Sequence, residues 1–144
     1  MNTHEHYMKL ALSEAKTAYD KGEIPVGVVV VCRDRIIARG YNLTETLNDV
    51  TAHAEMQAIT SAASALGGKY LTDCTFYVTL EPCSMCAAAL GWAQISSLVY
   101  GASDEKRGYT RFAPDVLHPK TTVLTGIMQD ECSALMKDFF KSKR

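Results

Sequence analysis

Residues 74–92, CTFYVTLEPCSMCAAALGW, join two kinds of local structure and carry a pair of cysteines at the junction. The first part is rich in β-branched and aromatic side chains, which predicts a strand over 74–80. An Ala-rich stretch follows, and a proline stands just before a predicted helix over 83–92, where it removes no hydrogen bond. Cys83 and Cys86 are three residues apart at this helix start, so both thiols can grip one metal ion.

A second short motif, His53-Ala54-Glu55, begins another predicted helix (53–66) that ends at a Gly-Gly pair. Residues two apart point to different sides of a regular helix. His53 and Glu55 can therefore face one site only if His53 lies at the very start of the helix. Asp49 and Thr51 precede it and are residue types that begin helices, which favours this geometry.

Together the two motifs supply one imidazole and two thiolates, a ligand set typical of zinc. Three protein ligands leave the fourth tetrahedral position for water, which is typical of a catalytic site rather than a structural one. Zinc lowers the pKa of that water to about 7, and a carboxylate that does not bind the metal can move its proton to a leaving amine. This pair of motifs is the signature of zinc nucleobase deaminases. The sequence predicts one Zn²⁺ per subunit, with His53, Cys83 and Cys86 as ligands and Glu55 as the proton shuttle.

The rest of the chain predicts an α/β fold. Helices are expected at 5–20 and 128–140, a strand hairpin at 26–32 and 35–41, and further strands at 95–101 and 121–125. Residues 42–51 and 103–120 are expected to be loops, the second with a short helical piece. Strands that alternate with helices predict a sheet covered on both faces. The length of 144 residues fits one domain, and no repeat or linker divides it.

Composition limits the remaining choices. The five cysteines are odd in number and unevenly spaced, which argues against a secreted disulfide framework, and Cys32, Cys74 and Cys132 are expected to be inert core residues. No apolar run approaches the length of a membrane span, and residues 1–8 lack the layout of a signal peptide, so we expect no membrane partner and a cytoplasmic location.

The net charge of −1 gives no global argument for a nucleic-acid partner. The charge is uneven, however: residues 101–144 hold 8 basic and 6 acidic side chains, whereas residues 1–100 hold 7 and 10. The basic residues near the C-terminus are Lys137, Lys141, Lys143 and Arg144. They fit either a phosphate-binding rim or a solvated helix face.

With these residues assigned, the chain resembles the bacterial tRNA adenosine deaminases of the cytidine deaminase superfamily, which convert adenosine to inosine at the anticodon wobble position. The similar segments are 22–27 (GEIPVG), 51–55 (TAHAE), 79–86 (TLEPCSMC), 101–104, 115–118 (DVLH) and 131–140 (ECSALMKDFF). The resemblance implies a three-layer α/β/α fold with a five-stranded mixed sheet, one zinc-dependent deaminase domain over residues 1–144, a homodimer, and the tRNA anticodon loop as partner.

The resemblance also implies substrate contacts. Asn42 would contact the base, Ala54 would contribute its backbone, and the residues of the pocket wall would be Ile24, Pro25, Val26 and Leu80. The loop after the fourth strand departs from the family, which usually has Lys-Thr-Gly-Ala-Ala-Gly-Ser after Asp104, where this chain has EKRGYTRF at 105–112. Here Asp104, Lys106, Arg107 and Arg111 are expected to meet RNA, and Tyr109 or Phe112 either stacks on bases or packs the domain.

Two other functions are compatible with a zinc site of this kind. A deaminase of a free base or nucleotide, such as guanine, cytosine, cytidine or dCMP, has the same motifs, and would be expected to close its pocket with an aromatic lid for which Phe139 and Phe140 are candidates. A non-catalytic module stabilised by zinc would have no reason to place Glu55 beside the metal.

Overall fold

A five-stranded sheet forms the centre of the computed structural model, which describes residues 3–143. Its strands are β1 (Gly27–Cys32), β2 (Arg35–Tyr41), β3 (Cys74–Leu80), β4 (Ser97–Ala102) and β5 (Thr122–Thr125), in the order β2-β1-β3-β4-β5. β1 runs antiparallel to both β2 and β3, whereas β3, β4 and β5 run parallel to one another. The predicted mixed sheet of five strands is confirmed.

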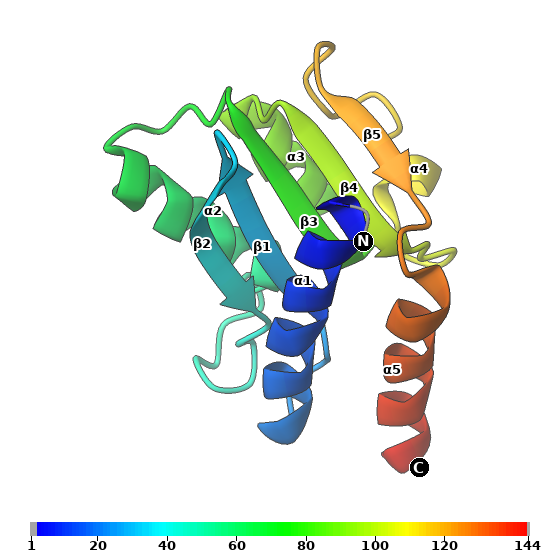
Figure 1. Cartoon of the computed structure of the whole chain (residues 1–144). Coiled ribbons are helices and arrows are strands. Elements are labelled where there is room, and N and C mark those ends of the chain that lie inside the picture. The colour runs from blue at the N-terminus through cyan, green and yellow to red at the C-terminus, as the bar shows by residue number, and fades with distance from the viewer. Residues whose placement is uncertain (1–2, 144) are drawn as a thin grey trace.

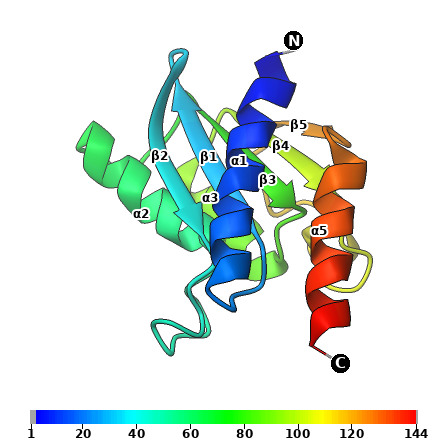
Figure 2. The same ribbon diagram turned by 60° about the horizontal axis from the view of Figure 1, so that its bottom comes forward.

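Helices cover both faces of this sheet (Figure 1). α1 (Thr3–Asp20) and α5 (Gln129–Ser142) lie on one face, and α2 (Ala54–Leu66) and α3 (Ser84–Ala93) lie on the other, as Figure 2 shows from a second direction. Val28 and Val30 of β1 pack in the core cluster that includes α2 and α3, whereas Val29 packs in the cluster that includes α1. Because β1 is buried on both faces, its sequence GVVVVC is apolar without alternation. The three-layer arrangement is confirmed.

Two glycines let helices lie close to the sheet. A Cβ at Gly27 would collide with the backbone carbonyl of Ala11 in α1. A Cβ at Gly40 would lie 2.8 Å from the carbonyl oxygen of Ala54, at the first turn of α2. Larger residues at these positions would push the helices outward. Gly40 thus keeps the start of α2, which carries His53 and Glu55, against the end of β2.

Most boundaries follow the sequence prediction, and the differences have local causes. β4 begins at Ser97, two residues later than expected, because Gln94 takes a left-handed φ of 58° that ends α3 before the strand starts. The short helical piece expected in 103–120 is α4 (Tyr109–Phe112). The three isolated cysteines are buried, and burial raises the pKa of Cys74 and Cys132 to about 12.

Arg144, which belongs to the C-terminal basic residues, lies outside the described part of the chain. Across residues 3–143, every helix is too short or too polar to cross a membrane.

Candidate active site

Three potential metal-binding atoms converge where α2 and α3 begin. The Nδ1 atom of His53 lies 3.6 Å from the Sγ atom of Cys83 and 3.4 Å from the Sγ atom of Cys86. All three atoms lie within 4.8 Å of one another. A tetrahedral zinc ion with Zn–S of about 2.3 Å and Zn–N of about 2.0 Å separates its nitrogen and sulfur ligands by about 3.5 Å. The spacing of these side chains therefore fits one zinc ion.

Two of these residues stand immediately before a helix rather than inside it. His53 precedes α2 with φ −68° and ψ 155°, and Cys83 precedes α3 with φ −73° and ψ 173°. The prediction made His53 the first helical residue, and the structure places it one residue earlier. Its extended backbone removes it from the helical spacing that would separate it from Glu55.

Asp49 and Thr51 do not cap α2 as the sequence led us to expect. Asp49 Oδ1 instead accepts hydrogen bonds from the backbone N–H and the hydroxyl of Thr51, at 2.8 and 2.7 Å. His53 makes no capping hydrogen bond with its side chain, so its imidazole remains available for the metal. The pair therefore orders the loop that delivers His53.

The two thiols share their proton unequally. A hydrogen bond from Cys86, opposed by burial and helped by His53, lowers the pKa of Cys83 to about 4. The same hydrogen bond with Cys83, together with burial, raises the pKa of Cys86. One thiolate is thus present at neutral pH, and metal binding has to displace only the proton of Cys86 from this pair.

Glu55 is the second residue of α2 and its side chain is buried beside the two thiols. Burial raises the pKa of Glu55 to about 7, and the thiolate of Cys83 adds to the effect, while its own backbone N–H and His53 oppose it. The carboxyl also hydrogen-bonds with Cys86. A carboxyl group that titrates near neutrality can both accept and return a proton at the working pH.

The end of β2 brings most of the expected pocket residues toward the start of α2. The backbone N–H of Asn42 donates to the carbonyl of Val26 at 3.2 Å, and the N–H of Leu43 donates to the carbonyl of Ala52 at 2.9 Å. Asn42 is buried and its Nδ2 donates to Glu23 and Thr44. Ala54 is buried in the first turn of α2, Pro25 is buried, Val26 is half-buried, and Ile24 is 39% exposed.

Leu80 differs from the other expected pocket residues. It is the last residue of β3, and its half-buried side chain packs with the core cluster that includes α1. That cluster lies on the sheet face opposite α2 and α3. This packing places Leu80 beside the cluster that includes α1, and its place in the pocket wall stays a prediction.

The divergent loop lies beside Cys83. Asp104 Oδ1 accepts hydrogen bonds from the backbone N–H groups of Lys106 and Arg107, at 3.1 and 3.0 Å. The exposed side chains of both basic residues line a groove of about 290 Å³ with Cys83 and three further residues, Ser84, Met85 and Phe112. Asp104, Lys106 and Arg107 therefore belong to one turn at the rim of the candidate metal site.

Two buried glutamates that the sequence analysis did not assign hold the loops around this site. Glu81 accepts hydrogen bonds from the backbone N–H of Asp104 at 3.0 Å and from Thr110. Glu23 accepts bonds from the N–H of Glu45 at 3.0 Å and from Thr46. Their partners lie 22 to 29 residues away along the chain, so neighbouring residues give no signal for these contacts beyond a charged residue close to an apolar run.

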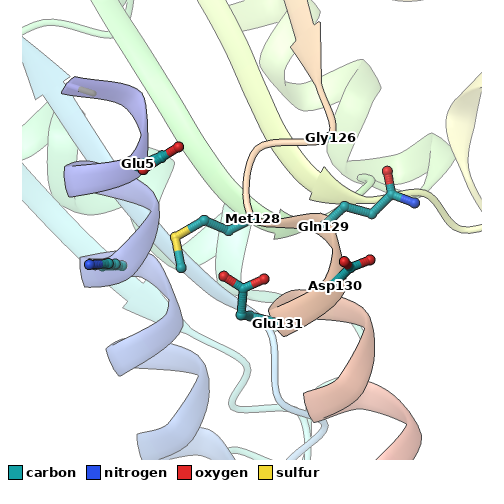
Figure 3. A pocket seen from close by; sticks show the side chains of 7 residues that line it. Glu5, Gly126, Met128, Gln129, Asp130 and Glu131 are labelled. Carbon is teal, nitrogen blue, oxygen red and sulfur yellow. The ribbon is translucent and has the colours of Figure 1, made fainter. Parts of the chain in front are cut away.

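A second hollow lies between the start of α1 and the start of α5, on the opposite face of the sheet (Figure 3). Its lining includes the carboxylates of Glu5, Asp130 and Glu131 and the ammonium of Lys9, but no histidine or cysteine. It lacks the residue types of the predicted chemistry and is separate from it.

Of the two candidates for the aromatic lid of a free-base deaminase, Phe139 is buried and Phe140 is exposed. The ring of Phe139 meets that of Tyr19 in α1 edge to face, with centroids 5.4 Å apart. It fastens α5 to α1, whereas Phe140 is 47% exposed.

Comparison with known proteins agrees with this arrangement. The family model of the cytidine and deoxycytidylate deaminase zinc-binding region matches residues 1–102. This range includes His53, Glu55, Cys83 and Cys86.

Individual relatives cover nearly the whole chain. A tRNA-specific adenosine deaminase of Agrobacterium fabrum is 44% identical over 96% of this chain and 95% of its own length. A solved structure from a study of A-to-I editing by tRNA:A34 deaminases is 44% identical, with a TM-score of 0.85 over 90% of this chain and 98% of that one. A guanine deaminase structure from Bacillus subtilis is 42% identical but covers 72% of this chain and 66% of that one, with a TM-score of 0.67.

Proposed function

Because the chain belongs to the tRNA-specific adenosine deaminases of the cytidine and deoxycytidylate deaminase family, we propose that His53, Cys83 and Cys86 hold its zinc ion and that Glu55 moves the proton in the conversion of adenosine to inosine in tRNA. The observation that carries this proposal is the convergence of His53 Nδ1 with two thiol sulfurs, at 3.4 and 3.6 Å, beside a buried carboxyl.

The chemistry follows from the donor set. Bound zinc lowers the pKa of water to about 7 and so supplies a nucleophile at neutral pH. Glu55 would hold the proton that the nucleophile gives up and would return it to the exocyclic amine, so that ammonia can leave as the C–N bond breaks; the proton of the new C6 hydroxyl would end on the ring nitrogen in the inosine product. The raised pKa of Glu55, caused by burial, suits it to both transfers.

The substrate contacts remain part of the proposal. Asn42 and the backbone of Ala54 would orient the base, with Ile24, Pro25 and Val26 as a wall. Asp104 would shape the turn in which Lys106 and Arg107 meet phosphates. Leu80, at the end of β3, would complete the wall, and its half-buried side chain also packs with the core cluster that includes α1.

The most direct test is mass spectrometry of an anticodon stem-loop RNA incubated with the zinc-loaded protein. We expect one adenosine, at the wobble position, to gain the mass change of deamination. Free guanine, cytosine, cytidine and dCMP are included because the chain is also similar to a guanine deaminase. Turnover of a free base with none of the RNA would overturn the substrate assignment and leave the zinc chemistry.

We further propose that the chain is a cytoplasmic homodimer and that all 144 residues form one deaminase domain. Trp92 on α3 is 83% exposed, an unusual exposure for a large aromatic side chain, and it stands beside the small residues of that helix. Light scattering at micromolar concentration should give twice the mass of 15.8 kDa, and Trp92→Glu should give the monomer mass. A monomeric wild-type protein would contradict the dimer.

A further inference from the structure

The two aromatic residues of the divergent loop differ in burial. Tyr109 is 3% exposed and packs in the core cluster of α2 and α3. Phe112, three residues later at the end of α4, is 60% exposed and lines the groove beside Cys83. The sequence left both residues open to packing or stacking, and the structure assigns packing to Tyr109.

The exposed ring is held in place by its surroundings. Arg111 Nη1 donates to the carbonyl of Glu105 at 3.2 Å, and its guanidinium lies 5.2 Å from the ring centroid of Phe112. The backbone N–H of Tyr109 donates to the carbonyl of Pro82 at 2.9 Å, next to Cys83. The first residue of α4, the helix that carries Phe112, is therefore hydrogen-bonded to the backbone next to a candidate metal ligand.

The same groove is also lined by two cationic side chains. Lys106 and Arg107 line it and are exposed, and the ion pairs found within residues 3–143 involve neither of them. A groove with one aromatic face and two available cations matches a nucleotide of a single strand, whose base stacks while its phosphate meets the charges.

We propose that Phe112 is the stacking platform for the base of a nucleotide next to the reacting adenosine, with Lys106 and Arg107 at its phosphate. This inference rests on the proposed function and deepens it. It assigns a contact to the stretch where the chain departs from the small residues usual in its family, so it is a property of this chain. A free-base deaminase would have no use for this groove.

The test combines protein and RNA changes. Phe112→Ala should lower kcat/KM for the anticodon stem-loop by about 5- to 150-fold, the range for one base stacked on an aromatic side chain. Phe112→Trp should restore most of the loss, and Phe112→Leu should not. An abasic site on the 5′ or the 3′ side of the adenosine should lower wild-type kcat/KM similarly. One of the two neighbouring bases is expected to stack on Phe112. For the RNA that lacks this base, adding Phe112→Ala should lower kcat/KM no further than either change alone.

Tyr70 provides a matched control. It is 53% exposed, and the ammonium of Lys69 lies 5.3 Å from the centroid of its ring. It precedes the N-terminal end of β3, whereas Cys83 follows the C-terminal end of that strand. Tyr70→Ala should leave the RNA kinetics unchanged. Equal zinc content and melting temperature in all variants would exclude unfolding as the cause.

Multiplicative losses with both abasic RNAs, or full activity of Phe112→Leu, would overturn the stacking proposal while leaving the deaminase assignment intact. If the wild type deaminates no RNA, the proposed function fails instead. The affinity for the same RNA, measured by fluorescence anisotropy, then decides the stacking proposal. Phe112→Ala should weaken this affinity by about 5- to 150-fold, and an unchanged affinity would overturn the proposal.

Discussion

Glu81 holds Thr110 twice through its Oε2 atom, which accepts the backbone N–H at 3.1 Å and the hydroxyl at 2.7 Å. Its other oxygen accepts the N–H of Asp104 at 3.0 Å, so one buried carboxylate spans both ends of the basic loop. Gly108 lies against the same carboxylate, and a Cβ there would collide with it. Because Glu81 is two residues from Cys83, the loop and the candidate metal ligand are positioned by one short segment.

Glu81→Gln should therefore raise KM for the anticodon stem-loop more than it lowers kcat. An amide keeps the size of the side chain but replaces one acceptor oxygen by a donor, which leaves an N–H or hydroxyl of the loop unpaired. Hydrogen bonds to charged groups contribute about 1.5 to 3 kcal/mol, so we expect KM to rise by about 10-fold or more. Steady-state kinetics over a range of RNA concentrations would measure the two constants separately.

Thr110→Val is the graded control, since it removes the hydroxyl bond and keeps the backbone bond. It should raise KM less than Glu81→Gln does. Zinc content should stay at one per chain in both variants. Loss of zinc, or an unchanged KM in the glutamine variant, would mean that Glu81 does not act by holding the loop.

Much of the fold was predictable because the elements have strong local signals. The apolar runs at β1 and β3, the glycine stops and the proline before α3 mark element ends that depend on neighbouring residues alone. The convergence of His53, Cys83 and Cys86 was predictable for a related reason, since both motifs stand at helix starts. The exact position of His53, one residue before its helix, depends on how the loop reaches it and was missed.

The contacts of Glu81 and Glu23 were not predictable in this way. Each glutamate bonds to a loop that comes next to it only after the sheet has formed, and hydrogen-bond partners distant in sequence leave no periodic pattern. The same reason explains why Tyr109 and Phe112 could not be separated beforehand: their different burial depends on how α4 packs against α3. The packing of Leu80 with the cluster that includes α1 likewise depends on how the end of β3 lies in the finished fold.

Glu55→Gln should keep the fold and the metal but lose activity. Glutamine has nearly the same shape, yet it cannot take a proton from water at neutral pH. We expect kcat to fall by about 100- to 10,000-fold, the usual contribution of a general acid or base. Single-turnover deamination with metal analysis of the same sample would test this, and near-native turnover would exclude Glu55 as the shuttle.

The zinc content of cysteine variants should distinguish the two metal-site cysteines from the three isolated ones. Wild-type protein should hold one zinc ion per chain, and Cys83→Ala and Cys86→Ala should each hold far less, because a three-ligand site loses one of its two thiolates. Cys132→Ala is the matched control, since this thiol is also buried but lies on α5. It should retain the full zinc content. Zinc loss from the control alone, or iron in place of zinc in the wild type, would contradict the ligand assignment.

The last prediction concerns acid stability and Glu23. Burial raises the pKa of this carboxyl, but hydrogen bonds from Thr46 and Glu45 outweigh burial, so the net pKa lies below its usual value of 4.5. A folded-state pKa below the unfolded one stabilises the fold fully above about pH 4.5, and this contribution is lost as pH falls through the folded value. Glu23→Gln should thus lower the free energy of unfolding by about 1.5 to 3 kcal/mol at neutral pH.

The difference between wild type and Glu23→Gln should shrink as the pH falls below about 4.5, because the wild-type carboxyl becomes protonated as the pH passes through its lowered folded-state pKa. Urea unfolding at several pH values would measure it. Both proteins should be measured in the presence of a chelator. Neither then holds zinc at any pH, and acid release of zinc from His53 and the two cysteines cannot contribute to the difference. A difference in unfolding free energy that stays constant or grows in acid would show that the hydrogen bonds from Thr46 and Glu45 do not favour the charged form of Glu23.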